Sequence, residues 1–148
     1  MSYVASLRNS SIHVKKDLLR IIDANLNRSR EGLRVCEEIA RFVLEDKRLT
    51  GEFRILRHRI SHNIKKFPGK SRALLECRES LTDVGRKIFA PSRKKNYKDL
   101  FCANIQRVKE SLRVLEECSN IFSQSLSNSF AKLRFKVYEL EKKIIARL

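Results

Sequence analysis

Arginines and carboxylates alternate along part of the chain at a spacing that brings them to one side of a helix. Arg28, Glu31 and Arg34 follow one another at intervals of three residues, which sets their side chains one turn apart. Arginine pairs bind phosphate oxygens with a fork geometry, and a neighbouring carboxylate suits a Mg²⁺ ion that is shared with a phosphate. This pattern favours a site for a phosphorylated ligand.

The same pattern returns in the second half of the chain as Arg107, Glu110 and Arg113. Arg28 and Arg107 each fall on an otherwise apolar helical stripe, so we expect both to need an anionic partner. That partner is either a carboxylate, such as Glu110, or a ligand phosphate. Alternating charges are also typical of a solvated, salt-bridged helix surface. The recurrence of the pattern in both halves favours a shared anion site.

Apolar residues recur at alternating steps of four and three along these stretches, as they do in the packed helices of a bundle. The predicted elements are a helix over 18–45 capped by Asp17, a turn over 46–51, a helix that ends at Phe67-Pro68-Gly69, a short helix at 72–78, a third long helix after the cap Asn96, and a fourth from about Asn128 to the end. These helices must position the charged residues.

The two halves of the chain resemble each other. Residues 25–42 read NLNRSREGLRVCEEIARF and residues 104–121 read NIQRVKESLRVLEECSNI, while FRILRHRI at 53–60 matches FAKLRFKV at 130–137. We therefore predict an all-α protein, one domain in which a duplicated αα-hairpin forms an antiparallel four-helix bundle with a pseudo-twofold axis. The predicted parts are an irregular N-terminal tail, a first hairpin, an irregular linker and a second hairpin, at residues 1–17, 18–66, 67–96 and 97–148.

Composition narrows the class of protein. The chain has 148 residues, 42% hydrophobic and 34% charged, which indicates one folded domain and not a disordered basic tail. Its 33 Lys and Arg against 17 Asp and Glu give a formal net charge of +16, so we expect anionic partners. Four Gly and two Pro are too few for an all-β sandwich or barrel. No signal peptide or apolar run of roughly 18 residues is found, and we expect a cytoplasmic protein.

Several short motifs occur together over most of the chain. They are Ile21-Ile22-Asp23-Ala24-Asn25-Leu26-Asn27-Arg28, Glu31-Gly32-Leu33-Arg34, Glu37-Glu38, Leu56-Arg57-His58, Arg78, Asp83-Val84-Gly85, Ala103-Asn104-Ile105-Gln106-Arg107 and Tyr138-Glu139-Leu140-Glu141. With them the chain resembles, over about residues 18–145, the small helical, non-ribokinase type of hydroxymethylpyrimidine-phosphate kinase of thiamine biosynthesis, which is found alone or fused before thiamine-phosphate synthase. Glu79 departs from the aspartate expected beside Arg78. The chain ends without a synthase barrel, so it resembles the standalone form.

The resemblance implies transfer of the γ-phosphoryl group of ATP to 4-amino-5-hydroxymethyl-2-methylpyrimidine phosphate, with Mg²⁺ as cofactor. The acceptor is a phosphate oxygen that is largely ionised near neutral pH, because the second pKa of a phosphate is about 6, so no strong general base is needed. The residues expected to be catalytic are Arg28, Glu31 and Arg34. Those expected to bind substrate are Asp23 and Asn27, which would contact the pyrimidine, and Arg41, Arg57, Arg107 and Arg113. Those expected to bind metal are Glu31, Glu110 and Asp83.

Two other functions stay open. A basic helical bundle that binds nucleic acid would show affinity that falls steeply with salt and no ATP turnover, but the sequence has few aromatic residues and no nucleic-acid motif. A helper domain would assist thiamine-phosphate synthase without catalysis, and release of ADP by the isolated chain would separate it from a kinase. The sequence predicts no membrane partner and leaves both a homo-oligomer and the identity of the phosphoryl donor open.

Overall fold

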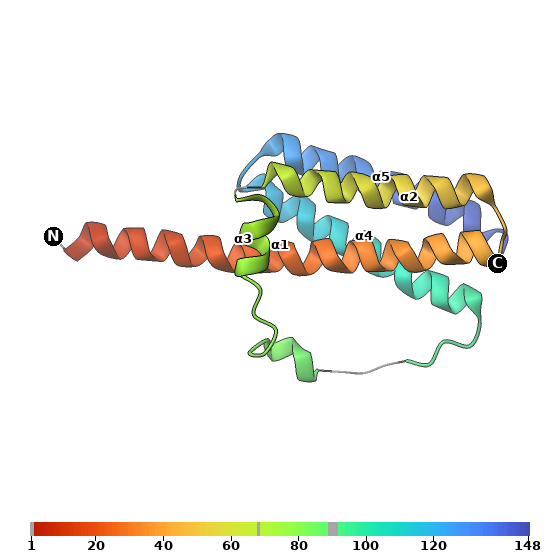
Figure 1. Ribbon diagram of the computed structural model, residues 1–148, viewed down its shortest axis with the longest axis horizontal. Helices are drawn as coiled ribbons and strands as arrows, with labels where there is room; N and C mark the ends of the chain where they lie inside the picture. The colour runs from red at the N-terminus through yellow and green to blue at the C-terminus, as the bar shows by residue number, and fades with distance from the viewer. Residues whose placement is uncertain (1, 68, 89–91) are drawn as a thin grey trace.

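Helices make up the architecture of the chain (Figure 1). The computed structural model describes the backbone of residues 2–67, 69–88 and 92–148, and the side chains of residues 16–67, 69, 71–88 and 92–148. The elements, with 3₁₀ helices written η, are α1 (Ser2–Phe42), α2 (Lys47–Asn63), η1 (Ile64–Lys66), α3 (Lys70–Glu76), η2 (Val84–Lys87), α4 (Tyr97–Asn120) and α5 (Gln124–Ile145). These residues contain no strand, which confirms the predicted all-α class.

The four long helices α1, α2, α4 and α5 lie side by side, and the packed pairs α1–α2, α1–α4 and α4–α5 each run antiparallel (Figure 1). Each hairpin packs within itself, α1 against α2 and α4 against α5. The two hairpins meet mainly where α1 lies against α4, and the contact between α2 and α5 is much smaller. The helices that carry the repeated arginines and glutamates are therefore the central pair of the bundle.

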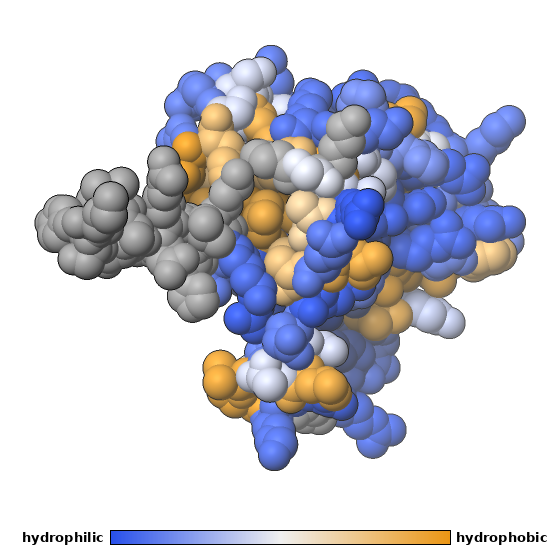
Figure 2. Space-filling view, turned by 60° about the vertical axis from the view of Figure 1, so that its left-hand side comes forward, coloured by the Kyte–Doolittle hydropathy of each residue, from blue (hydrophilic) through white to orange (hydrophobic). Residues whose placement is uncertain are grey.

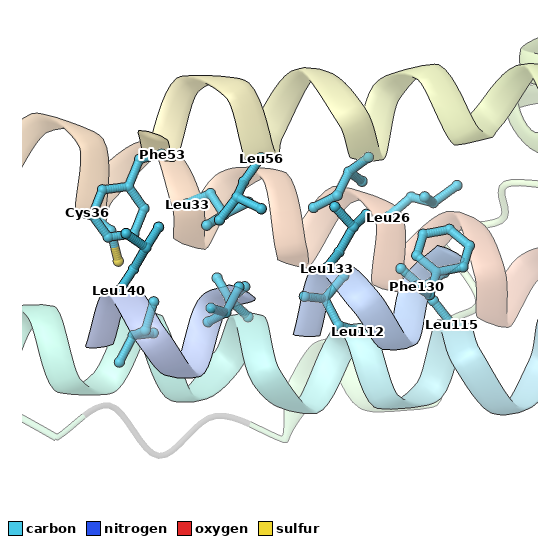
Figure 3. Packing of buried hydrophobic residues seen from close by; sticks show 14 of the residues in the cluster. Leu26, Leu33, Cys36, Phe53, Leu56, Leu112, Leu115, Phe130, Leu133 and Leu140 are labelled. Carbon is cyan, nitrogen blue, oxygen red and sulfur yellow. The ribbon is translucent and has the colours of Figure 1, made fainter. Parts of the chain in front are cut away.

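The apolar stripes of all four helices meet in one core (Figure 3). The rings of Phe53 and Phe101 pack edge to face, with their centroids 6.3 Å apart. The labelled residues of this core, which are all buried, are Leu26, Leu33, Cys36, Phe53, Leu56, Leu112, Leu115, Phe130, Leu133 and Leu140. Burial of one such large side chain contributes about 1.5–3 kcal/mol. The stripe predicted from the spacing of four and three is thus what holds the bundle together.

Polar caps fix where the helices begin. Asn96 accepts a hydrogen bond from the backbone N–H of Asp99 (2.8 Å) at the start of α4, which confirms the predicted cap. Asp46 caps α2 in the same way, so the turn predicted over 46–51 is shorter and α2 begins at Lys47. Ser123 caps α5, which begins at Gln124, earlier than expected.

The predicted irregular tail at 1–17, with Asp17 as a helix cap, is wrong for the described part of the chain. α1 begins at Ser2 and passes through Asp17 without interruption, and Figure 1 shows this part extending past the ends of its neighbours. Residues 2–17 contain no Gly and no Pro, so nothing in them breaks a helix. None of the described helices is both long enough and apolar enough to span a membrane.

The linker between the hairpins contains a short helix, as predicted near residues 72–78. This helix, α3, packs against α1, and its end buries Leu74 and Cys77. Gly69 precedes it with φ 72°, and a Cβ there would lie 2.4 Å from the Cβ of Ala73, so the position requires glycine. After α3 the chain exposes apolar side chains, and the hydrophobic patches at the bottom of Figure 2 lie on this segment. The linker is therefore held on the bundle mainly by α3.

Candidate functional site

Two hollows adjoin along α1. The first is about 530 Å³ in volume and lies between α1 and the segment after α3, with walls formed by Asp17, Arg20, Ile21, Asp23, Ala24, Asn25, Asn27, Arg28, Arg78, Glu79, Ser80 and Asp83. The second is about 590 Å³ and lies between α1 and α4, with walls formed by Asn25, Arg28, Glu31, Ala103, Gln106, Arg107, Glu110, Ser111 and Val114. Because they share Asn25 and Arg28, we treat them as one site, the α1 groove, with a linker half and an α4 half.

The α4 half brings together the charges that the sequence repeats. Arg28 and Glu31 come from α1, and Arg107 and Glu110 come from α4. All four side chains are exposed. Neither arginine forms an ion pair with any residue that the structure describes, although two carboxylates line the same hollow. The groove therefore holds two guanidinium groups that are free to meet an anionic ligand.

The expectation that these two arginines are embedded in apolar surroundings is wrong. Their stripe lies at the edge of the α1–α4 contact, where long side chains reach water, while the adjacent stripe with Leu26 and Leu33 takes the buried positions. An arginine on such an edge keeps its aliphatic stem against the protein and its charged end in solvent. The guanidinium groups are consequently accessible to a ligand.

Small side chains set the distance between the two central helices beside the groove. A Cβ on Gly32 would lie 2.7 Å from Cγ2 of Val108 and 2.9 Å from the backbone oxygen of Asn104, so any other residue would force α1 and α4 to shift there. Ser111, the counterpart of Gly32 in the repeat, is buried and donates its hydroxyl to the backbone oxygen of Arg107 (2.7 Å). The groove thus lies beside a rigid, closely packed pair of helices.

An ion pair joins the linker half of the groove to α1. Arg78 donates from Nε to Oδ2 of Asp23 (2.7 Å) and from Nη2 to Oδ1 (2.8 Å). The hydrogen bonds to Asp23, followed by its charge, raise the pKa of Arg78 above its ordinary value. Asn27 lies next to this pair, with Nδ2 3.5 Å from Oδ1 of Asp23. Arg78 is one of the residues that carry the family resemblance, but the sequence assigns it no role, because no spacing on either helix indicates its partner.

The three acids predicted to bind metal do not form one cluster. Glu31 and Glu110 line the α4 half, whereas Asp83 lines the linker half and accepts a hydrogen bond from the N–H of Gly85 (2.8 Å). No group of three or more His, Cys, Asp or Glu side chains suited to a metal occurs among the described residues. Two carboxylates beside arginines still match Mg²⁺, which uses one or two protein carboxylates together with phosphate oxygens.

Four of the predicted site arginines lie outside the groove. Arg34 pairs with Glu37 (3.5 Å) and Glu38 (3.2 Å) on its own helix. Arg57 donates to Glu37 from α2 (3.1 Å). The other two are Arg113, which pairs with Glu116 (2.8 Å) and Glu117 (2.6 Å), and Arg41, whose guanidinium lies 4.6 Å from the ring centroid of Phe42.

These ion pairs follow the repeat and join the helices of each hairpin. Glu37 is fully buried and binds Arg54 (3.0 Å) as well as Arg57, and Glu116 binds Arg134 of α5 (2.9 Å). We call these two networks the hairpin clamps; they comprise Glu37 with Arg34, Arg54 and Arg57, and Glu116 with Arg113 and Arg134. Burial acts to raise the pKa of Glu37, but the hydrogen bonds from its arginines outweigh burial and hold that pKa below its ordinary value.

Comparisons with known proteins point to a single family. A family model described as the ThiD2 family matches residues 20–143. The thiamine-phosphate synthase of a Nostoc species is 35% identical over 130 residues, which is 86% of this chain and 35% of that protein. The synthase of a Synechocystis species is 37% identical over 126 residues, 84% of this chain and 35% of that protein. The chain therefore spans about a third of the length of these relatives, and no solved structure matches it.

Proposed function

The chain belongs to the ThiD2 family, and from this membership and the α1 groove we propose that it transfers the γ-phosphoryl group of ATP to hydroxymethylpyrimidine phosphate in thiamine biosynthesis. The observation that supports the proposal most directly is the pair of unpaired guanidinium groups, Arg28 on α1 and Arg107 on α4, in the wall of one groove. A phosphoryl transfer between two phosphorylated molecules must bring two polyanions together, and such a pair counters their repulsion.

The acceptor chemistry fits a site without a general base. The attacking atom is a phosphate oxygen that is already ionised near neutral pH, so the protein has to position it and stabilise charge. Arg28 borders both halves of the groove and would contact both phosphorylated molecules, while Arg107 would contact one of them. Glu31 and Glu110 would hold Mg²⁺, which neutralises phosphate charge when it is bound.

The linker half of the groove suits the pyrimidine ring. Asn27 offers an amide that can both donate to a ring nitrogen and accept from the exocyclic amino group. Asp23 cannot serve freely in the same way, because both of its oxygens bind Arg78. We assign Asp23 the role of a positioning residue that fixes Arg78 at the edge of the site.

The test is release of ADP by the purified chain supplied with MgATP and the pyrimidine monophosphate. Replacing Arg107 by Gln (Arg107→Gln) should lower kcat about 100-fold or more, as expected when a charge-stabilising donor is lost, and Arg28→Gln should act similarly. Arg113→Gln is the matched control, because Arg113 lies in a hairpin clamp outside the groove. Full turnover by folded Arg107→Gln protein would show that the site lies elsewhere.

A second function is favoured by the relatives themselves. They are named thiamine-phosphate synthase, and the chain spans about 35% of their length. The chain would then assist a synthase without catalysing phosphoryl transfer. In that case the isolated chain releases no ADP in the assay above, and its addition raises the rate of a separately purified thiamine-phosphate synthase. The same experiment thus separates the two functions.

A further inference from the structure

A second basic hollow lies between α2 and α5, on helices that do not contribute to the α1 groove. Its volume is about 260 Å³, and no carboxylate lines it. The cationic residues in its wall are Arg59, Lys66 and Lys132, and His62 lies beside them. We call this hollow the α2–α5 pocket.

The backbone places the basic side chains of the pocket around a fixed polar contact. Asn63, which is 3% exposed, donates from Nδ2 to Oγ of Ser129 (3.0 Å), and Ser129 donates back to Oδ1 of Asn63 (3.2 Å). Arg59, His62 and Lys66 follow at steps of three and four along α2 and η1, so they share one face. The pocket therefore has a buried, rigid base and a rim of positive charge.

Because the chain is duplicated, the pocket can be compared with the equivalent residues at the other end of α2 and α5. The match of residues 53–60 with 130–137 makes Glu52 the counterpart of Ser129, Lys136 that of Arg59, and Lys143 that of Lys66. At the far end of the same helix pair, Glu52 forms ion pairs with both lysines, with Nζ of Lys136 at 3.4 Å and Nζ of Lys143 at 3.5 Å. Glu139, the counterpart of His62, also lies 2.9 Å from Nζ of Lys136, so two carboxylates compensate the cations there.

The α2–α5 pocket lacks these carboxylates. Ser129 stands where the repeat has Glu52, and none of Arg59, Lys66 and Lys132 pairs with an acid in the described part of the chain. Clustered like charges in one concavity repel each other, and a bound anion relieves that repulsion. Arg59 and Lys66 thus keep the positive charge of their counterparts, whereas Ser129 and His62 stand where the other end has Glu52 and Glu139.

We propose that the α2–α5 pocket binds a small anion with the charge of a diphosphate, which takes the place of the carboxylates that Glu52 and Glu139 supply at the other end. Arg59 offers fork geometry to phosphate oxygens, and the lysines add point charges. The volume is below the roughly 300–1,000 Å³ of pockets for drug-sized ligands, so the ligand is a diphosphate group and not a whole nucleotide. This site is independent of the α1 groove and does not rest on the kinase function.

The probe is pyrophosphate, titrated into the full chain at constant ionic strength while backbone amide shifts are followed by NMR. Amides of residues 59–66 and of Lys132 should shift in a saturable way. Replacing two lysines, as Lys66→Gln with Lys132→Gln, should weaken binding at this pocket at least about tenfold, because charged hydrogen bonds are lost. Lys136→Gln with Lys143→Gln is the matched control at the other end and should leave the affinity of the pocket unchanged.

Two further variants exchange the carboxylate between the ends. Ser129→Glu should raise Tm without any anion and remove the pyrophosphate response, because the new carboxylate compensates the cations. Glu52→Ser combined with Glu139→Gln, which removes both carboxylates near Lys136, should make the amides around Lys136 and Lys143 respond to pyrophosphate. If ADP shifts the amides of the pocket as pyrophosphate does, the pocket binds the diphosphate group of a nucleotide. If only pyrophosphate shifts them, the pocket binds the free ion. Absence of shifts in the pocket, or equal shifts in the Lys66→Gln, Lys132→Gln protein, would overturn the proposal.

Discussion

The hairpin clamps and the α1 groove use the same residue types on the same helices and differ in what faces them. In the first clamp, Glu37 of α1 faces α2, which supplies Arg54 and Arg57, so the charges cancel within the hairpin. In the groove, Arg28 and Glu31 face α4, which carries the same pattern because it is the repeat of α1.

This difference explains why one set of charges is structural and the other is free. A pseudo-twofold relation brings like residues toward one another, as in a symmetric dimer interface. At the α1–α4 contact the same pattern of arginine and glutamate lies on both helices, and neither Arg28 nor Arg107 forms an ion pair with a described residue. The groove at the centre of the bundle therefore keeps two guanidinium groups without an ionic partner, which suits it to an anionic ligand.

Breaking the first clamp should have the largest effect on stability. Glu37→Gln should lower the free energy of unfolding by about 2–3 kcal/mol, because it leaves the arginines of the clamp without a buried counter-charge. This value is smaller than for a fully buried ion pair, because Arg34 and Arg54 are partly exposed and water screens their charges. Urea denaturation monitored by circular dichroism measures the change. Glu116→Gln is the matched variant in the second clamp and should cost less, since Glu116 is 15% exposed. Equal and negligible losses would show that the clamps do not hold the hairpins.

Disturbing the close contact between α1 and α4 beside the groove should lower the free energy of unfolding somewhat less. Gly32→Ala should lower stability by about 1–2 kcal/mol, because its methyl group would overlap Val108 and the backbone oxygen of Asn104. Gly51→Ala is the control within α2, where nothing lies within 4 Å of the added Cβ, and it should raise stability by about 0.5–1 kcal/mol. Thermal unfolding of both variants tests this, and a stabilised Gly32→Ala protein would contradict the close approach of α1 and α4.

Much of the bundle could be predicted from the sequence, because the features that define its helices depend on residues that are close together in the chain. Apolar spacing indicated which stripe of each helix is buried, the repeat indicated two equivalent hairpins, and Asn96 with Asp99 indicated the start of α4. The beginnings of α2 and α5 were harder to predict, since Asp46 and Ser123 are as typical of turns as of helix caps.

The site was less predictable, because helical periodicity gives the face of a residue and not what lies opposite. Arg28 has Glu31 at the same spacing at which Arg34 has Glu37, so the two arginines look alike in the sequence, and only the structure shows that Arg34 forms ion pairs with its neighbours. The bond between Asp23 and Arg78 joins residues 55 positions apart, with Arg78 on an irregular segment. No pattern along one helix could predict such a contact.

Acid should weaken the first clamp, which contains Glu37. The pKa of Glu37 is lowered in the folded protein, so its contribution to stability is full above the pKa of an unfolded glutamate, about 4.3, and is lost as pH falls through the folded pKa. The stability difference between the wild type and Glu37→Gln should therefore shrink as the pH falls below about 4.3. Urea denaturation at several pH values checks this. A difference that stays constant would show that Glu37 contributes without its charge.

The smallest effect on stability is expected for substitutions of the groove arginines. These substitutions test directly whether the groove differs from the hairpin clamps. Arg28→Gln and Arg107→Gln should each change the free energy of unfolding by less than about 0.5 kcal/mol, because both side chains are exposed and have no ionic partner in the described structure. Arg57→Gln, which removes a half-buried member of a clamp, is the control and should destabilise clearly. If Arg28→Gln or Arg107→Gln unfolds as readily as Arg57→Gln, then these arginines bridge the hairpins. A loss of ADP release would in that case reflect unfolding, whereas a loss at unchanged stability would assign the two arginines to phosphate binding.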